Sequence, residues 1–301
     1  MQILKKITHH AVKICLAISA IVLLKQFCSS KTDGFALYKI CSSLCFNPDW
    51  ETTPLSPQER DEVLPLFDQP FYYLAKGAQS YVFVSADGQT VIKFFRLYHL
   101  RPPLYLSLLT LPLPLQPYKI NKMLEKRQDL DKDFQSYKIA FEKMREESGL
   151  LYLHLNKTSH LKKTLTFYNK IGVIHHVDLD QMEFLVQKRA LLVYPAIDHL
   201  VKTQGIDSAK RAISSLVKLL MCRYEKGIFD KDPDLNTNFG FLGTSLETAV
   251  QIDIGRFQSQ PLSVDRNEIL RITDNFRQWL DRNYPELSGY LLSEINQIGT
   301  L

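Results

Sequence analysis

The sequence predicts an α+β protein in which an antiparallel β-sheet comes first and a mainly helical part follows it. Runs rich in β-branched and aromatic residues occupy positions 71–74, 81–85 and 90–96, as strands do. Residues 208–226 instead place apolar side chains at the spacing of one helix face. With 45% apolar and 23% charged residues, the chain of 301 residues has the composition of a globular protein.

Residues 1–30 are expected to form a separate leader. A basic start is followed by the apolar run Ile14 to Leu24 and then by Lys25. A spanning helix needs roughly 17 or more apolar residues, and a count from Ala11 to Phe27, with Lys13 and Lys25 extending toward the lipid headgroups, comes near that length. We expect a membrane-associated segment, either an uncleaved anchor or a signal-like sequence. A soluble amphipathic or buried helix is the alternative.

The net charge of +5 comes mostly from the same end of the chain. Residues 1–50 contain six lysines against Asp33 and Asp49, so the remaining residues are close to neutral. This distribution argues against a nucleic-acid partner. Four of the five cysteines also lie in residues 1–50, which excludes a disulfide scaffold for the rest of the chain.

Three further regions follow the leader. Residues 31–70 contain several prolines and acids, which indicate a linker. Residues 71–190 are expected to form a small lobe, with a turn at Ala86-Asp87-Gly88, a proline-rich stretch over 101–118 that excludes a regular helix, a charged helical region over 120–155, and strands over 165–179 and 182–189. Residues 191–301 are expected to form a helical large lobe, with the helix 208–226 ending at Gly227, short strands over 239–242 and 249–254, and a last helical region from Asp265.

A turn of small residues, Ala75 to Ser80, lies between the first two predicted strands and contains Gly77. Lys93 lies on the third strand. Such a turn lets backbone N–H groups approach phosphates, and a lysine on the neighbouring strand neutralises phosphate charge. Taken alone, the pattern is equally that of an ordinary hairpin with an exposed lysine.

A loop rich in carboxylates and carboxamides follows the long helix. Its members are Asp230, Asp232, Asp234, Asn236 and Asn238. They indicate a divalent cation site, or a catalytic base beside a metal-binding asparagine; a solvated acidic turn is the alternative. An EF-hand is excluded, because Leu235 stands where that loop needs glycine and Phe241 where it needs a bidentate glutamate.

Asp253 ends an apolar strand and is followed by Ile254 and Gly255. A carboxylate is costly to bury unless a cation or a donor satisfies it, so Asp253 is a candidate metal ligand. An aspartate that binds its own turn is the alternative.

In this order, the three motifs resemble those of the protein-kinase-like fold over about residues 71–257, and more narrowly those of bacterial kinase-like proteins with an N-terminal membrane-associated segment. The resemblance implies two lobes, an antiparallel β-sheet small lobe and a short, mainly helical large lobe, that bind ATP and Mg²⁺. It assigns the phosphates to Gly77, Ser80 and Lys93, the catalytic base to Asp232 in Lys231-Asp232, and the metal to Asn238 and Asp253.

The chain departs from the family pattern in two places. Asp230 replaces the histidine of H-R-D, and Asn238 follows Asp232 by six residues instead of five, so Asn236 stays open as the metal ligand. Glu147 is the first choice for the helix residue that pairs with Lys93, with Glu146 and Glu142 also open.

The resemblance implies an ATP- and Mg²⁺-dependent phosphotransferase that acts on an unknown hydroxyl acceptor on a protein, sugar or lipid. About 45 residues follow Gly255 and no A-P-E motif is present, which favours the small-molecule, lipid or sugar kinase-like branches. Because ATP is cytosolic, we expect the body of the protein on the cytoplasmic side of the membrane. The alternative is a catalytically degenerate pseudokinase, or a membrane-anchored scaffold that binds a protein partner.

Overall fold

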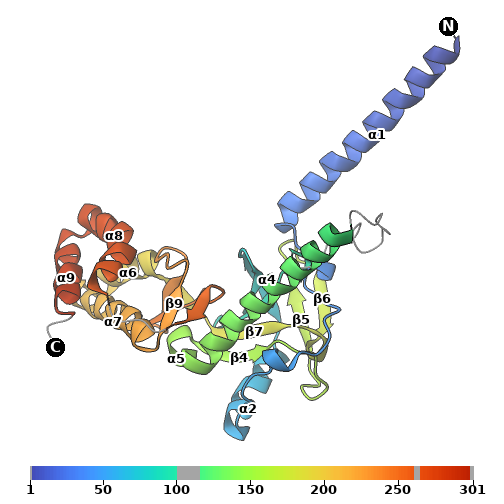
Figure 1. Ribbon diagram of the computed structural model, residues 1–301. Helices are drawn as coiled ribbons and strands as arrows, with labels where there is room; N and C mark the ends of the chain where they lie inside the picture. Colours follow the sequence, from blue (N-terminus) through green and yellow to red (C-terminus); the bar gives the residue numbers. More distant parts are fainter. Residues whose placement is uncertain (1, 100–115, 261–264, 299–301) are drawn as a thin grey trace.

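The computed structural model describes residues 2–99, 116–260 and 265–298, so most of the proline-rich stretch lies outside the described residues. The chain has an α+β fold, with a half built on a large sheet followed by a helical half (Figure 1). The long helix α1 (Gln2–Thr32) projects away from both halves. Its segment Val12–Thr32 is long and apolar enough to cross a membrane, and its side chains are exposed.

The large sheet has seven strands in the order β4-β7-β3-β2-β1-β5-β6. Every neighbouring pair is antiparallel except β1 and β5, which are parallel. The strands are β1 (Phe71–Lys76), β2 (Ser80–Ser85), β3 (Thr90–Phe95), β4 (Leu150–His154), β5 (Thr164–Tyr168), β6 (Ile174–Asp178) and β7 (Phe184–Lys188).

The first three strands form the predicted meander, and local chemistry fixes the turn between β2 and β3. The carboxylate of Asp87 accepts hydrogen bonds from Ser85 Oγ over 2.6 Å and from the backbone N–H of Gln89 over 2.9 Å. Gly88 follows at a φ of 72°, which a glycine adopts without strain. The turn therefore forms where the Asp-Gly pair predicted it.

Two predicted elements differ from the structure. The strand expected over 165–179 is a hairpin, because Asn169 closes a turn by accepting hydrogen bonds from the N–H groups of Ile171 and Val173. The helical region expected over 120–155 contains α4 (Gln116–Lys143) and the short α5 (Arg145–Ser148), and it ends at Gly149 with a φ of 65°. The residues that follow form β4.

Residues 33–68 differ from the predicted linker because they pack against the sheet and against α4. They form the 3-10 helices η1 (Leu37–Lys39), η2 (Pro48–Trp50) and η3 (Leu64–Asp68), together with α2 (Pro57–Val63). Phe35, Trp50 and Phe67 are buried. Burying such a side chain contributes about 1.5–3 kcal/mol, which explains why a proline-rich segment is held in place.

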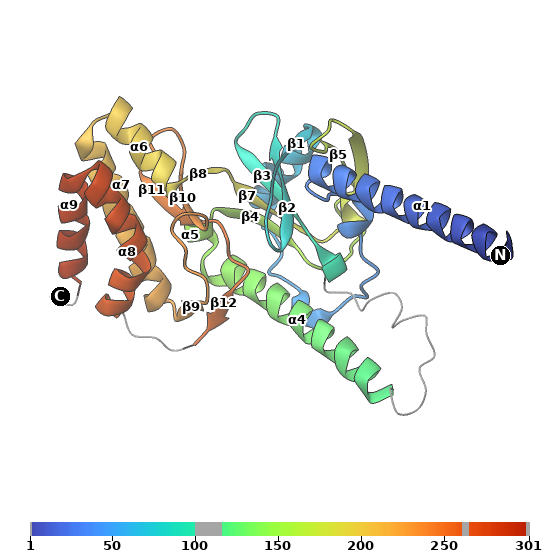
Figure 2. The same cartoon turned by 90° about the horizontal axis from the view of Figure 1, so that it is seen from above.

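The helical half contains α6 (Val193–Thr203), α7 (Ile206–Glu225), α8 (Arg266–Asn283) and α9 (Pro285–Asn296). Two small sheets lie beside them, made of β11 (Thr248–Gln251), β10 (Phe239–Leu242) and β8 (Ala190–Leu192), and of β12 (Phe257–Ser259) and β9 (Ile228–Asp230). Figure 2 shows α4 reaching from the helical half along the sheet half. One apolar core runs through α4, β4 and the helices α6 to α9, and it joins the two halves.

Candidate functional site

A cavity of about 570 Å³ lies where the two halves meet. Its wall is formed by the turn after β1, the β3 residues Val91 and Lys93, the segment 187–192 that connects the halves, and residues 252–254. Thr237, from the acidic loop, also lines it. The cavity has the size of small-molecule sites in proteins, and all three sequence motifs contribute to it.

The turn that contains Gly77 and Ser80 forms one wall of this cavity. The N–H of Gly77 donates to the carbonyl oxygen of Ser80 over 2.9 Å, which closes the turn. Arg96 supports it from behind, by donating from Nη1 to the carbonyl oxygens of Gly77 (2.7 Å) and Ala78 (2.9 Å). Both predicted residues therefore line the cavity on a turn whose backbone is held in a defined shape.

Lys93 crosses the cavity from the sheet to the Asp253 turn. Its Nζ donates to the carbonyl oxygen of Ile252 over 2.7 Å. Burial in the cavity lowers the pKa of Lys93, and the carboxylate of Asp253 opposes that shift. The lysine of the first motif thus faces the aspartate of the third.

Asn238 joins the acidic loop to the Asp253 turn. It is buried, and its carbonyl oxygen accepts from the N–H groups of Ile252 (2.8 Å) and Asp253 (3.3 Å). Its side-chain Nδ2 donates to the carbonyl oxygen of Asp232 over 2.6 Å. Asn236 is exposed, and its N–H donates to Asp234 Oδ1. The asparagine next to Asp253 is therefore Asn238.

Asp232 itself is exposed at the start of this loop, and its N–H donates to Asp230 Oδ1 over 3.0 Å. Asp230 is buried at the position where the resemblance expects a histidine. Its Oδ2 lies 3.5 Å from Arg223 Nη1 and accepts from Gln251 Nε2 over 2.5 Å. Burial raises the pKa of Asp230, while the hydrogen bond from Asp232 and the charge of Arg223 lower it. This buried network ties the loop to α7 and β11.

Glu147 does not lie in the cavity, and the predicted pairing of Glu147 with Lys93 is wrong. Helix α4 ends at Lys143, and the separate turn α5 directs Glu147 toward α7. There it forms an ion pair with Lys226 and accepts from Cys222 Sγ over 3.2 Å. One of the two open alternatives, Glu142, has its Oε1 atom 3.9 Å from Lys138 Nζ, one turn away on the same helix.

Two residues that the sequence motifs did not single out occupy the space between α4 and the Asp253 turn. Tyr137, buried on α4, donates from its hydroxyl to Gln79 Oε1 over 2.7 Å. Gln79 Nε2 reaches the carbonyl oxygen of Gly255 at 3.4 Å. Gln79 lies inside the small-residue turn, so its position was a signal, whereas no motif indicated that Tyr137 would contact it.

Helix α4 also holds the Asp253 turn through Ser136. Its Oγ donates to the carbonyl oxygen of Ile254 over 2.5 Å and accepts from the N–H of Phe257 over 2.6 Å. The backbone on both sides of Gly255 is thereby fixed to the helix. Asp253 Oδ1 accepts from the N–H of Gly255 over 3.2 Å, so the carboxylate is oriented from within its own turn.

The donor set around Asp253 suits Mg²⁺. Within residues 2–99, 116–260 and 265–298, no group of three or more His, Cys, Asp or Glu side chains could hold a metal ion. Mg²⁺ does not need such a cage, because one or two protein oxygens with phosphate oxygens and water complete its octahedron. The carboxylate of Asp253 and the amide oxygen of Asn238 would supply the protein oxygens.

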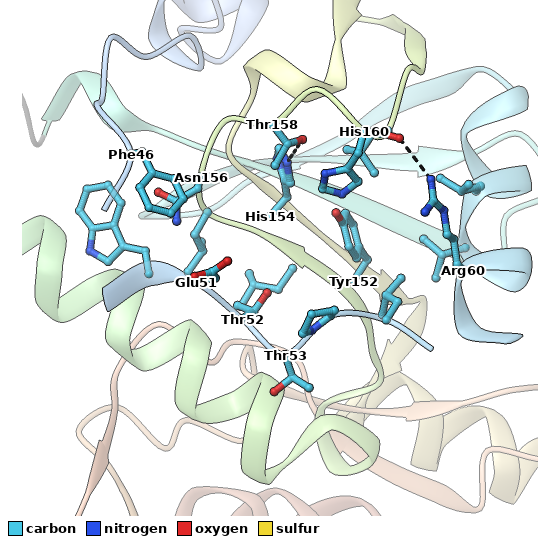
Figure 3. A pocket seen from close by; sticks show the side chains of 18 residues that line it. Phe46, Glu51, Thr52, Thr53, Arg60, Tyr152, His154, Asn156, Thr158 and His160 are labelled. Carbon is cyan, nitrogen blue, oxygen red and sulfur yellow. Dashed lines mark hydrogen bonds between the residues drawn. The ribbon is translucent and has the colours of Figure 1, made fainter. Parts of the chain in front are cut away.

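A second cavity, of about 330 Å³, lies on the sheet half between residues 46–64 and the region from β4 to Leu161 (Figure 3). Two of its polar side chains bond to neighbours. Arg60 Nη2 donates to the carbonyl oxygen of His160 over 3.2 Å, and His154 Nε2 lies 3.0 Å from Thr158 Oγ1. The residues predicted for the site all lie elsewhere.

Comparison with protein-family models gives no match, and no curated protein matches the chain. Among solved structures, a high-resolution crystal structure of WbdD is similar with a TM-score of 0.34 and 15% identity, over 76% of this chain and 45% of that one. A second structure, described as the bifunctional kinase-methyltransferase WbdD, gives a TM-score of 0.33 and 16% identity over 74% and 43%. The chain therefore spans less than half the length of these proteins.

Proposed function

We propose that the chain is a two-lobed kinase-like phosphotransferase that binds ATP and Mg²⁺ in the cavity between its halves. The contact of 2.7 Å between Lys93 Nζ and the carbonyl oxygen of Ile252 carries this proposal. It puts the ammonium group of Lys93 beside Asp253. The backbone N–H of Asp253 donates in turn to the carbonyl oxygen of Asn238. Lys93 and Asp253 line the cavity, and Asn238 is hydrogen-bonded to the segment before Gly255. Phosphoryl transfer in kinases uses a lysine, a carboxylate and an asparagine of this kind.

Each residue of this constellation has a role. Gly77 lets the backbone of its turn approach the phosphates, and Ser80 closes that turn, while Lys93 neutralises phosphate charge. Asp253 and Asn238 hold the cation, which stabilises charge on the transferred group when it is bound. Asp232 is exposed at the start of the acidic loop, where an acceptor hydroxyl can approach it. Its carboxylate takes the proton of that hydroxyl.

Nucleotide binding tests the proposal. The full chain in detergent is titrated with ATP and Mg²⁺, and its Tm is followed; a ligand at 100 times its Kd stabilises the folded state by about 2.7 kcal/mol. We expect Lys93→Ala and Asp253→Ala to abolish the shift. Lys210→Ala, at a partly exposed lysine paired with Glu286 in the helical half, is the matched control. A missing shift in the wild-type chain, or equal shifts in all variants, would overturn the proposal.

A pseudokinase or protein-binding scaffold is the second candidate. One observation favours it: Tyr137 and Gln79, rather than an acid from α4, fill the space beside the Asp253 turn. Turnover of radiolabelled ATP with candidate acceptors separates the two functions. An active phosphotransferase loses turnover in Asp232→Asn while it keeps ATP binding, whereas a scaffold shows no turnover for either chain.

The proposal extends to where the reaction occurs. ATP is cytosolic, so the body of an active enzyme anchored by α1 would lie on the cytoplasmic side. The acceptor would be a hydroxyl of a protein, a sugar or a lipid. Protection of the body from added protease in sealed inverted and right-side-out vesicles distinguishes the two orientations.

A further inference from the structure

Helix α1 is fixed directly to the sheet half at a short joint. The helix ends at Thr32, and the chain turns through Asp33 and Gly34, whose φ angles are 51° and 70°. The N–H of Gly34 donates to the carbonyl oxygen of Ser29 over 2.7 Å. The next residue, Phe35, is buried against aromatic rings of β2 and β5. Side chains around Asp33 and Gly34 therefore lie at the point where α1 leaves the sheet half.

The fold gathers lysines around the joint. Lys31 lies in the last turn of α1, and Lys39 donates to the carbonyl oxygen of Gly34 over 2.5 Å. Lys170, from the turn between β5 and β6, pairs with Asp33 over 2.7 Å. Lys76 Nζ, from the end of β1, lies 3.9 Å from the place where a Cβ on Gly34 would stand. Two of the four lysines come from distant parts of the sequence, and Asp33 neutralises one charge.

Exposed apolar side chains lie next to these lysines. Ile171 and Val173, in the same turn as Lys170, and Ile174, the first residue of β6, are 55%, 48% and 50% exposed. Tyr38, beside Lys39, is 64% exposed. Both ribbon views place the end of α1 next to β5 (Figures 1 and 2). An apolar tip with adjacent basic residues is typical of surfaces that enter the headgroup region of a bilayer.

We propose that this docking face rests on the anionic headgroups of the bilayer that α1 crosses. The face consists of Lys31, Lys39, Lys76 and Lys170 with Tyr38, Ile171, Val173 and Ile174. The length of α1 selects the bilayer as the occupant. The candidate span Val12–Thr32 has 21 residues, which at 1.5 Å per residue is about 32 Å, close to the thickness of the hydrocarbon core. Its lysines, Lys13, Lys25 and Lys31, lie toward its two ends, where their side chains can extend to the headgroups. The span ends one residue before Asp33, so the joint and its lysines fall at headgroup level.

Docking would orient the rest of the molecule. A helix tethered by a flexible linker lets the attached domain tumble, whereas a joint of two residues with a lipid-bound hairpin does not. The sheet half would keep one face toward the membrane, and the turn between β5 and β6 would enter the headgroup layer.

Depth-dependent fluorescence quenching tests the proposal on the full chain in lipid nanodiscs. After subtraction of the signal of Trp50 and Trp279, measured in the parent chain, Val173→Trp reports on the tip, and Thr244→Trp, on an exposed turn of the helical half, is the control. The discs contain brominated phosphatidylcholine, with or without about a third of phosphatidylglycerol to supply negative charge. We expect bromine to quench Val173→Trp at least twofold more than Thr244→Trp, and the difference to grow with phosphatidylglycerol.

Charge reversal separates the lysines from the apolar tip. Lys76→Glu with Lys170→Glu, placed in the Val173→Trp chain, should halve the quenching in anionic discs. The same change at Lys202 and Lys210, in the helical half, should leave it unaltered. One molar salt applied to the chain with unchanged lysines should act like the first pair, because it screens exposed charges without a substitution.

Three outcomes would overturn the docking face. The first is bromine quenching at Val173→Trp that is no stronger than at Thr244→Trp, even with α1 inserted. The second is quenching that is independent of lipid charge and salt. The third is a tryptophan at position 173 that neither a water-soluble quencher nor bromine quenches. That result would mean that protein covers the tip.

Discussion

Tyr137 on α4 donates a hydrogen bond of 2.7 Å to Gln79, which reaches over from the turn after β1. Gln79 also contacts the carbonyl oxygen of Gly255 at 3.4 Å. One side chain thus links the turn after β1, the long helix and the Asp253 turn. In the kinase pattern, an ion pair between the strand lysine and a helix glutamate couples such elements. Here neutral hydrogen bonds do so, and they do not depend on the charge of Lys93.

Gly255→Ala tests this packing. A Cβ at position 255 would lie 1.8 Å from Gln79 Oε1 and 2.9 Å from Tyr137 Oη, so we expect overpacking to lower the free energy of unfolding by about 1–3 kcal/mol. Adding Gln79→Ala should restore most of that loss, because it removes the atom nearest to the new methyl group. Urea denaturation of the full chain in detergent measures both. Gly289→Ala in α9 is the control, since no atom lies within 4 Å of the place that the new Cβ would take. If Gln79→Ala brings no recovery, the contact with Gly255 is not the source of the strain.

Substitution by alanine should lower the free energy of unfolding strongly at Asp230 and hardly at all at Asp232. Asp230→Ala leaves Arg223 buried without its carboxylate, and we expect unfolding to become easier by about 3–5 kcal/mol. Asp232→Ala, at an exposed position, should change the free energy of unfolding by less than about 0.5 kcal/mol. If Asp232 is the catalytic base, that variant nevertheless loses phosphoryl transfer. Denaturation combined with turnover measures both effects, and similar losses of stability would contradict the contrast.

The stability of the chain should fall as pH rises through the range 4–6 because of Asp133 on α4. Burial raises the pKa of this carboxyl to about 6; the charge of Arg256 opposes the shift, and Asp129 and Asp253 add to it. In this range the folded state keeps a proton that the unfolded chain, with a carboxyl pKa near 3.9, releases. Asp133→Asn should therefore resemble the wild type at pH 4 and exceed its Tm by about 2 °C above pH 6. Thermal unfolding between pH 4 and 8 measures this. A difference that is constant with pH would exclude Asp133 as the cause.

Cys222 should resist alkylation. Burial raises its pKa to about 11, and its hydrogen bond to Glu147 adds to the effect. Since only the thiolate reacts, we expect a rate at pH 8 at least about tenfold below that of exposed Cys45, as followed by mass spectrometry of the full chain. Glu147→Gln should raise the rate at Cys222 and leave Cys45 unchanged. Equal rates at the two cysteines would show that Cys222 is neither buried nor held by Glu147.

Local sequence patterns predicted the elements whose causes are local. The meander over 71–96 follows from runs rich in β-branched and aromatic residues and an Asp-Gly turn, and α7 follows from helix periodicity that ends before Gly227. The split of the predicted strand over 165–179 was missed because Asn169 closes its turn with a side chain. The packing of residues 33–68 was missed because their prolines indicated a linker, although Phe35 and Trp50 carried the opposite signal.

The candidate site also has features that the sequence predicted and features that it did not. Motif order indicated which segments come together: Lys93 Nζ contacts the carbonyl oxygen of Ile252, and the carbonyl oxygen of Asn238 accepts from the N–H groups of Ile252 and Asp253. The roles assigned to these residues stay predictions. The position of Glu147 could not be predicted from its distance along the chain, because the break after Lys143 changes which way the helix residues face. The contact between Tyr137 and Gln79 depends on the rotation of α4 over the sheet, which the sequence pattern leaves undetermined.

The place of β7 in the sheet affects how the protein is made. This strand lies between β4 and β3, so the edge of β3 stays open until residues 184–188 have left the ribosome. By then α1 has long been available to the membrane-insertion machinery. An unpaired edge strand is a site of aggregation, and pairing across almost one hundred residues is slow. Under the proposed anchoring by α1, each nascent chain would pass through a stage in which a half-finished sheet is held at the membrane and kept apart from its neighbours, and early anchoring would then act as a safeguard during biosynthesis.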